Sequence, residues 1–165
     1  MWWNNPKFRL IEKIIVVWLG GQPHYWPDTW EFNLAQDITA ARVVLDCGVP
    51  LVQIPCTGVT SHLLTTMPEL ETHLKGKNAV SDALVELFKE YHADHFGWAK
   101  EIWDISAIAY VINPNLVPTS LVHAPIISDQ LTWGLNNDRH FIRTAVSIDR
   151  NSIFKDMFTK LAHVK

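Results

Sequence analysis

The apolar run KIIVVWLGG, at Lys13–Gly21, constrains the fold of this chain more than any other segment. Most of its residues are β-branched or large and apolar, and no polar residue alternates with them. A run of this kind predicts a strand that is covered on both faces, as in a parallel sheet. It is also far shorter than the roughly 20 residues that span a membrane, so we expect a soluble protein.

The segments after this run predict a βαβ unit. Two prolines place QPHYWPDTW, residues 22–30, in a loop, and NLAQDITAARVVLDCG, residues 33–48, has apolar residues at helical spacing. Gly48 stands where such a helix would end. VPLVQIPC, residues 49–56, then reads as a second buried strand. Strand, helix and strand with short connections favour a right-handed crossover between parallel strands.

The remainder of the chain predicts further helices and a few short strands. Helices are expected over residues 68–74, over 78–96 with one apolar side, from Asp104 to the residue before Pro114, and over 150–162. From residue 119 to 148 the pattern changes to short β-like runs around the turn-rich GLNNDR. We therefore predict an α/β fold: a mostly parallel sheet flanked by helices, with a late antiparallel addition.

Composition excludes several classes of function. The chain has 165 residues, of which 48% are hydrophobic and 19% charged, so it can bury the core of one domain. The net charge is −3 and no Lys/Arg block occurs, which argues against a nucleic-acid or anionic-membrane surface. The N-terminal MWWNNPKFR lacks a signal-peptide pattern, and Cys47 and Cys56 suit neither a metal site nor a disulfide scaffold. We expect a cytoplasmic protein with reduced cysteines.

Two polar features mark a candidate site. The triplet Glu31-Phe32-Asn33 lies just beyond the glycines that end the first strand, and in parallel sheets ligands bind at the carboxyl ends of strands. Asp104 follows Trp103 and opens an apolar helix. It has two interpretations: a capping residue that accepts bonds from the free N–H groups of the helix, or an oxygen ligand for a hard cation such as Ca²⁺.

These motifs resemble one family when they are taken together. VVWLGG, then WEFNLAQDITAARVVLDCGVPL and later IWDISAIAYVINP, are similar to the C-terminal half of the inosine-uridine-preferring nucleoside hydrolases. The resemblance runs from about residue 5 to residue 158. It implies the C-terminal half of a Rossmann-like sheet, and it implies hydrolysis of the N-glycosidic bond between ribose and a nucleobase with the help of Ca²⁺. Residues 1–165 would then form a partial hydrolase domain, with the family's tendency to form homo-oligomers.

The resemblance also implies roles for single residues. Glu31 and Asn33 would bind ribose hydroxyls, beside Phe32, because a carboxylate and an amide complement groups that both donate and accept. Asp104 would ligate the Ca²⁺. We expect neither Glu31 nor Asn33 to contribute much to stability, since both are assigned to binding.

Three departures from the family pattern affect the expected chemistry. Trp103 stands where many members have a histidine that protonates the leaving base; an indole can stack on a base but cannot titrate. Tyr25 stands where members have an asparagine, so the nucleobase preference is open. The Asp-rich D-x-D-x-G-x-D-D segment, which supplies most calcium ligands and the general base, has no match in this sequence. We therefore expect the isolated chain to lack hydrolase activity.

Tyr91 and His95 are further candidates for the nucleobase end of the site, because their helix precedes Trp103; a solvent-exposed helix end is the competing interpretation. Two alternatives to a hydrolase remain open as well. One is a catalytically inactive remnant that binds ribose or a partner chain. The other is a generic α/β sugar-binding module, which leaves the paired motifs unexplained.

Overall fold

The computed structural model describes residues 13–164, which divide into two compact units. The first unit comprises residues 13–60 and 103–148, and the second comprises residues 61–102 and 149–164. The predictions that fall on residues 1–12, including the start of the family resemblance, lie outside the described residues. No helix within residues 13–164 is long and apolar enough to cross a membrane.

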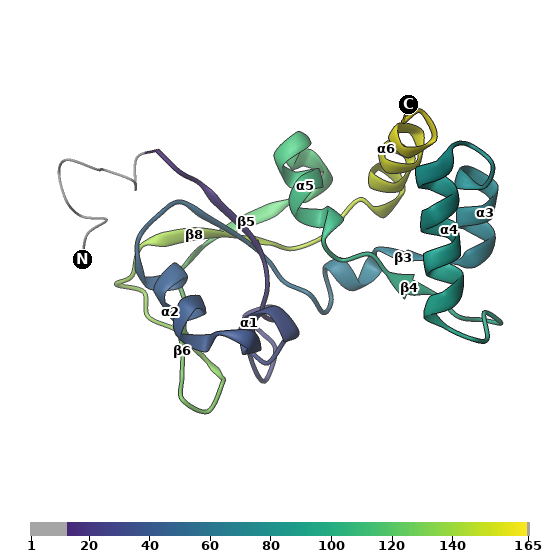
Figure 1. The fold of residues 1–165 in the computed structure, drawn as a ribbon. Helices are drawn as coiled ribbons and strands as arrows, with labels where there is room; N and C mark the ends of the chain where they lie inside the picture. Colours follow the sequence, from purple (N-terminus) through teal and green to yellow (C-terminus); the bar gives the residue numbers. More distant parts are fainter. Residues whose placement is uncertain (1–12, 165) are drawn as a thin grey trace. The chain divides into compact units, whose positions relative to one another are not determined.

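The first unit is built around a four-stranded sheet (Figure 1). Its strands lie in the order β1-β2-β8-β5, with bounds Val16–Leu19, Leu51–Ile54, Phe141–Ala145 and Thr119–His123. β1 pairs in parallel with β2, and β2 in parallel with β8, whereas β5 is antiparallel to β8. A second antiparallel pair, β6 (Ile126–Ile127) with β7 (Trp133–Gly134), follows β5. The predicted α/β class, with its mostly parallel sheet and late antiparallel addition, is confirmed.

Four short helical segments complete this unit: α1 (Phe32–Gln36), α2 (Ile38–Asp46), α5 (Ile105–Ile112) and the 3₁₀ turn η4 (Pro114–Leu116). The prediction of one helix over residues 33–48 is wrong, because Asp37 adopts a non-helical conformation, with φ −150° and ψ 88°, between α1 and α2. Its carboxylate accepts a hydrogen bond from the backbone N–H of Ala40 at 2.8 Å, which caps α2. Gly48 has φ +73° just beyond α2, as the sequence predicted for the helix end.

The two faces of the sheet differ in how they are covered. Alternation along a strand places Val16 and Trp18 of β1 on one face and Ile15 and Val17 on the other. On the first face, α1, α2 and the β6–β7 pair bury a cluster made of Leu34, Ala41, Leu45, Leu51, Ala124, Ile127 and Ile142. On the second face α5 contacts β1, yet three apolar side chains stay more than half exposed: Ile15 (70%), Leu121 (59%) and Phe141 (55%).

We expect the isolated chain to self-associate through this second face and the edge of β1. β1 ends the strand order, so within residues 13–164 only β2 pairs with it, and open strand edges recruit strands of other chains. Light scattering at micromolar concentration should report a mass above that of a monomer. Ile15→Lys should lower that mass, whereas the matched Val80→Lys, at an exposed apolar position of the second unit, should not. A clean monomer of the unmutated chain would contradict this prediction.

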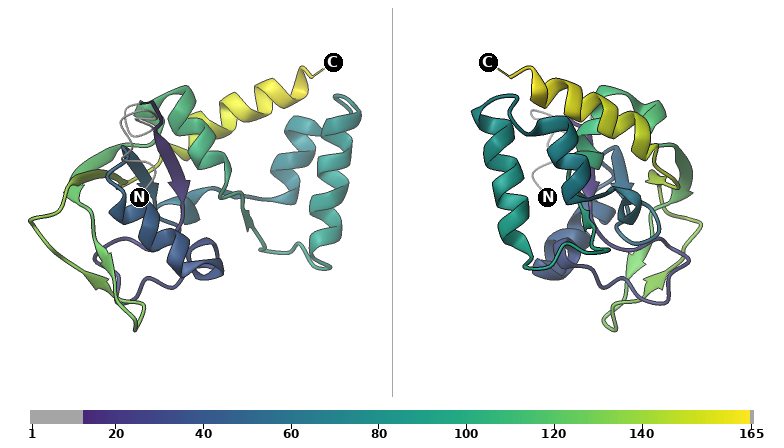
Figure 2. Two further views of the ribbon diagram at one scale, coloured as in Figure 1. Left: turned by 60° about the vertical axis from the view of Figure 1, so that its left-hand side comes forward. Right: turned by 90° about the vertical axis from the view of Figure 1, so that its right-hand side faces the viewer.

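Within the described residues, the second unit consists of three helices and one small antiparallel pair (Figure 2). The helices are α3 (Met67–Leu74), α4 (Ala79–Tyr91) and α6 (Arg150–Ala162), and the strands are β3 (Leu64–Thr65) and β4 (Lys100–Glu101). The 3₁₀ turn η3 (Thr60–His62) leads into this unit. α3 packs against both α4 and α6, and the sides that meet are apolar, with Leu70, Leu74, Val85, Ile153 and Phe158 buried.

The long helix predicted over residues 78–96 ends earlier, at Tyr91. Asn78 caps its start by accepting a hydrogen bond from the backbone N–H of Ser81 at 2.9 Å. At the other end His92 is extended, and Asp94 accepts a bond from the backbone N–H of Phe96 at 2.9 Å. Local side-chain bonds of this kind compete with helix continuation, so residues 92–99 form a loop.

Candidate functional site

The carboxyl ends of β1 and β2 are joined by backbone hydrogen bonds that continue past the strands. Gly20 N–H donates to Ile54 O at 3.1 Å, and Cys56 N–H donates to Gly21 O at 3.0 Å. Gly21 has φ +71°, and a Cβ there would lie 3.1 Å from the Gln53 amide and 3.2 Å from the Trp133 ring. A side chain at this position would therefore be strained both in its backbone and in its packing.

Glu31 is tied to this strand end by both of its carboxylate oxygens. Oε2 accepts from the backbone N–H groups of Gly21 at 2.9 Å and Leu34 at 3.2 Å, and Oε1 accepts from Asn33 N–H at 2.9 Å. The residue caps α1 and is only 9% exposed. The expectation that Glu31 contributes little to stability is therefore wrong, because three backbone donors depend on its carboxylate.

Asn33 lies next to Glu31 and is half-buried. Its amide Nδ2 donates to the carbonyl oxygen of Leu19 at 3.1 Å, at the very end of β1. Its Oδ1 accepts no hydrogen bond from the residues that the structure describes. The side chain is thus held in place by its donor end while its acceptor end stays available. Phe32, between the two polar residues, is 70% exposed.

Asp104 belongs to the same unit and lies near the same strand ends. Burial is the main reason why the pKa of the Cys56 thiol is raised. The charge of Glu31 and its hydrogen bond with the thiol raise this pKa further, and so does the charge of Asp104. Glu31 and Asp104 thus both act on the buried Cys56, whose thiol stays protonated at neutral pH. Asp104 thus lies within electrostatic range of the same cysteine as Glu31, although the two carboxylates are far apart in the sequence.

The capping role considered for Asp104 is not observed. Its side chain makes no capping hydrogen bond to α5, and it is exposed. Trp103, the preceding residue, is half-buried. In the first turn of α5, Ser106 has a fully buried hydroxyl that lacks a hydrogen-bond partner within the described residues. The Asp104 carboxylate is therefore free to meet a ligand.

A calcium ion needs about six to eight oxygen ligands. Nowhere in residues 13–164 do three His, Cys, Asp or Glu side chains gather closely enough to hold a metal. The Glu31 carboxylate is largely used by backbone N–H groups, so Asp104 is left as a single oxygen ligand. The described residues do not by themselves fit a calcium site.

Sequence reasoning missed a buried polar network beneath the loop of residues 22–30. Gln53 is fully buried in β2; its amide donates to Gly20 O at 3.1 Å, and its Oε1 lies 2.7 Å from His24 Nε2. Burial lowers the pKa of His24, and the bond to Gln53 partly offsets this. Gln22 bonds both Trp30 O and Thr57 N–H. The only signal in the sequence was a glutamine inside the apolar strand LVQI.

Tyr91 and His95 belong to the second unit, separate from the unit that holds Glu31, Asn33 and Asp104. Both pack around Trp98, with ring centroids 6.0 Å from Tyr91 and 5.3 Å from His95. His92 stacks on the same indole at 4.9 Å, with an interplanar angle of 13°. Tyr91 is 65% exposed, so this aromatic cluster presents ring surface to solvent.

Known proteins resemble this chain in both sequence and fold. The family model described as "Inosine-uridine preferring nucleoside hydrolase" matches residues 6–155. A search of curated proteins found no match. Among solved structures, an inosine-uridine preferring nucleoside hydrolase from Bacillus anthracis is similar with TM-score 0.73 and 19% identity, covering 98% of this chain and 55% of that one.

Two further structures are similar. An inosine-guanosine nucleoside hydrolase has TM-score 0.75 and 16% identity, over 98% of this chain and 57% of that chain. A purine-preferring ribonucleoside hydrolase from Gardnerella vaginalis has TM-score 0.66 and 20% identity, over 90% and 50% respectively. At such identities the likeness establishes the fold alone, and the chain spans about half the length of these proteins.

Proposed function

The chain belongs to the inosine-uridine preferring nucleoside hydrolase family, and we propose that it carries the ribose-binding part of an enzyme that hydrolyses ribonucleosides to ribose and free base. The observation that supports this most is the gathering of Glu31, Asn33 and Asp104 in one unit, near the carboxyl ends of β1 and β2. That edge is where open α/β sheets bind their ligands.

Ribose binding is compatible with the hydrogen bonds that Glu31 and Asn33 already make. A carboxylate offers about four lone-pair positions, and backbone N–H groups occupy three of them at Glu31. The Cys56 thiol also hydrogen-bonds this carboxylate, so a ribose hydroxyl would compete with the thiol for the remaining position. The Oδ1 of Asn33 offers a second acceptor, held in position because the amide of the same side chain is anchored on Leu19 O.

Held at its hydroxyls, the sugar would be positioned for cleavage of its bond to the base through an oxocarbenium-like transition state, as in glycoside hydrolysis. Trp103 would stack on the departing base, and Phe32 would cover the sugar edge. The Trp103 indole cannot act as the leaving-group acid, because its N–H does not titrate near neutral pH.

The family's Ca²⁺ would be held in part by Asp104, and when bound it would supply a water of lowered pKa. Since the described residues fit one ligand only, we propose that the other ligands and the general base come from a polypeptide segment with the D-x-D-x-G-x-D-D pattern. We also propose a cytoplasmic place in purine or pyrimidine salvage, and assembly into homo-oligomers.

Mutation of the ribose ligands tests this proposal in the enzyme completed with that segment. Asn33→Ala and Glu31→Gln should each lower kcat/KM by about 10- to 100-fold, because a lost hydrogen bond to a sugar hydroxyl costs about 1–3 kcal/mol in a closed site. The loss should be equal for inosine, guanosine and uridine, since ribose is common to all three. Asp37→Ala, which removes a cap of α2 only, is the matched control and should leave kcat/KM unchanged.

Trp103→Ala should behave differently from both ribose variants. It should change the ratio of purine to pyrimidine turnover, because it alters contacts to the base. If Asn33→Ala instead leaves kcat/KM intact for all three nucleosides while the protein stays folded by circular dichroism, the ribose-binding proposal fails.

A second candidate function is a remnant without catalysis that binds a partner chain. The observation that favours it is the half-exposed apolar face of the sheet, with Ile15, Leu121 and Phe141. A remnant without catalysis should show no turnover even when the Asp-rich segment is supplied. The rate measurements on the completed enzyme therefore distinguish the two candidate functions.

A further inference from the structure

The peptide unit that joins Gly20 to Gly21 is bonded to a side chain at each end. Its carbonyl oxygen, Gly20 O, accepts a hydrogen bond from Gln53 Nε2 at 3.1 Å. Its N–H, on Gly21, donates to Glu31 Oε2 at 2.9 Å. The peptide units before and after it are instead bonded to the backbone of residues 54–56. Gln53 and Glu31 thus hold opposite ends of a single peptide.

The orientation of the Gln53 side chain follows from its partners. Gln53 is fully buried in β2. Because a carbonyl oxygen can only accept, the end of the Gln53 amide that faces Gly20 O must be the NH₂ group. The amide oxygen therefore faces His24, whose Nε2 lies 2.7 Å away and must carry the hydrogen of that bond. The His24 ring in turn packs against Trp133, with ring centroids 4.9 Å apart.

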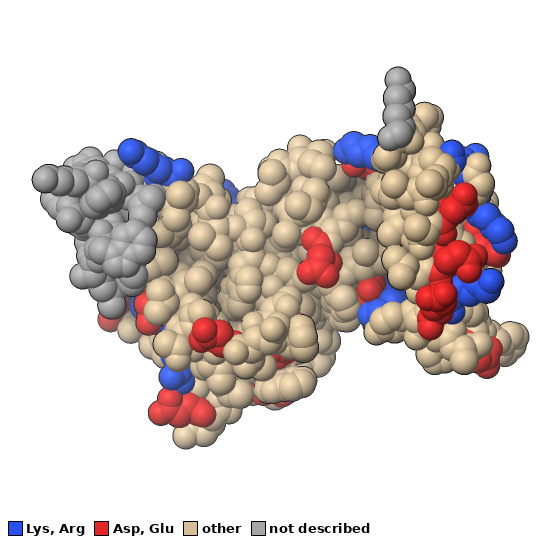
Figure 3. Space-filling model, viewed as in Figure 1, with Lys and Arg blue, Asp and Glu red and all other residues tan. Residues whose placement is uncertain are grey.

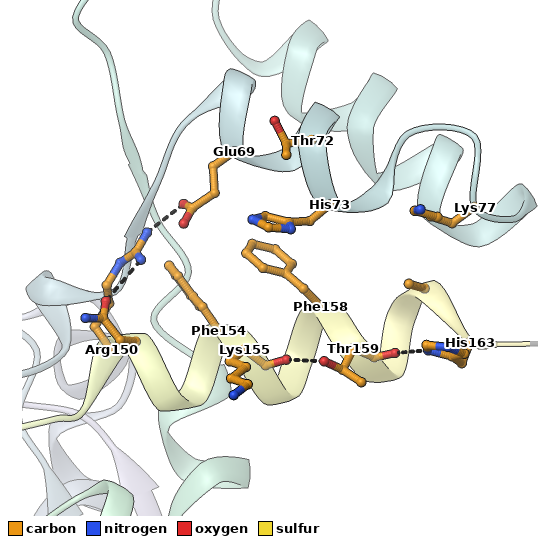
Figure 4. A pocket seen from close by; sticks show the side chains of 12 residues that line it. Glu69, Thr72, His73, Lys77, Arg150, Phe154, Lys155, Phe158, Thr159 and His163 are labelled. Carbon is orange, nitrogen blue, oxygen red and sulfur yellow. Dashed lines mark hydrogen bonds and ion pairs between the residues drawn. The ribbon is translucent and has the colours of Figure 1, made fainter.

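Backbone dipoles, and no cation among the described residues, stabilise the charge of Glu31. Elsewhere carboxylates lie beside cations: Figure 3 shows Lys and Arg side chains next to Asp and Glu side chains over the second unit. Figure 4 shows one such pair, in which Arg150 Nη2 donates to Glu69 Oε2 at 2.6 Å. Glu31 accepts instead from three backbone N–H groups. Hydrogen bonds are directional, so the position of this carboxylate depends on where those N–H groups point.

The N–H of Gly21 is the donor that fixes Glu31 relative to the sheet. The other two donors, Asn33 and Leu34, lie in α1, the helix that Glu31 itself caps. Gly21 lies beyond the end of β1 and has φ +71°. A peptide between two glycines is the least restricted kind of backbone, so its N–H could turn away from the carboxylate if its carbonyl were free. The bond from Gln53 prevents that rotation.

We propose that Gln53 is a positioning residue of the ribose site. By holding the carbonyl of the Gly20–Gly21 peptide, it directs the N–H of that peptide at the Glu31 carboxylate. His24 extends the chain of hydrogen bonds to the loop of residues 22–30, and each bond in such a chain polarises the next. The effect of Gln53 on ribose rests on the proposed function, whereas its effect on the N–H of Gly21 does not.

Proton–nitrogen NMR of the full chain, with titration of ribose, tests this role. In Gln53→Met, which keeps the size of the side chain and removes its amide, the amide proton of Gly21 should shift upfield as its bond to the carboxylate weakens. Ribose should bind about 10-fold more weakly. His24→Phe leaves β2 unchanged and should shift the same proton in the same direction by less. The matched control is Gln22→Met, because Gln22 is also buried and anchors the same loop by two hydrogen bonds; it should change neither the shift nor the affinity.

Two results for the amide proton of Gly21 would overturn the proposal. One is an unchanged shift in Gln53→Met. The other is an equal shift in Gln22→Met, since loosening of the whole loop would then explain both. If circular dichroism shows that Gln53→Met does not fold, His24→Phe decides in its place, and an unchanged shift in that variant overturns the proposal.

The ribose titrations separate this role from the proposed function. Ribose binding that survives Gln53→Met but is lost in Asn33→Ala would overturn the positioning role of Gln53. If the unmutated chain does not bind ribose and the amide proton of Gly21 still shifts as expected, the ribose site fails, while the role of Gln53 in holding Glu31 is upheld.

Discussion

Glu31→Ala should lower the free energy of unfolding of the chain by about 3 kcal/mol, because leaving a buried donor unsatisfied costs about 1–3 kcal/mol and a lost helix cap about 1 kcal/mol. The carboxylate accepts from the backbone N–H groups of Gly21, Asn33 and Leu34. Alanine offers these donors no acceptor, and at 9% exposure of Glu31 water cannot easily replace it. Urea denaturation followed by circular dichroism measures the change.

Asp37→Ala is the matched control for this experiment. Asp37 also caps a helix, but it accepts from a single backbone N–H, that of Ala40, and it is exposed. Its replacement should cost about 1 kcal/mol. Equal losses for Glu31→Ala and Asp37→Ala would show that the bond between Glu31 and Gly21 adds nothing to stability, and Glu31 would then be an ordinary cap.

The isolated chain should hydrolyse nucleosides at least about 100-fold more slowly than the same chain supplied with a D-x-D-x-G-x-D-D segment, since a general base alone contributes about 10²–10⁴-fold. No such motif occurs in this sequence, and Asp104 is the one exposed carboxylate assigned to the metal. Incubation with inosine, uridine and guanosine in the presence of Ca²⁺, with chromatography of the released base, measures the rates.

Turnover by the isolated chain within 100-fold of the completed enzyme would require another carboxylate of this chain to act as the base. Asp28 is exposed in the loop before Glu31, and its replacement by asparagine would then be the next variant to assay. Because both oxygens of Glu31 accept bonds from backbone N–H groups, any replacement of Glu31 is expected to destabilise the chain, and Asn33→Ala is the variant better suited to rate measurements.

Much of the fold followed from periodicity along the sequence. The continuous apolar runs became β1 and β2, paired in parallel. The helix predicted over residues 150–162 is α6, with the same bounds. Burial sets these patterns residue by residue, so a single sequence is enough to detect them. The motifs around Glu31 and Asp104 also indicated the family that the comparison found.

Other features depended on contacts that the sequence does not display. Helical spacing continued through Asp37 and His92, but a capping bond at Asp37 and local bonds around Asp94 end the helices there. Asp104 has the residue type of a cap, yet its side chain makes no such bond. The residue type shows which hydrogen bonds a side chain is able to form. Which of these bonds forms depends on the backbone groups that lie within its reach.

The sequence by itself determined the α/β class, the positions of β1, β2 and α6, and the pairing of the Glu31 and Asp104 motifs. Only the tertiary structure decided that Glu31 also supports the fold, because its partner Gly21 lies ten residues away and meets it only after the loop has closed over the strand end. Only the tertiary structure set α3 against α6, whose contact joins residues about 80 positions apart. Local patterns follow from local burial, whereas these contacts exist only once distant segments have packed together.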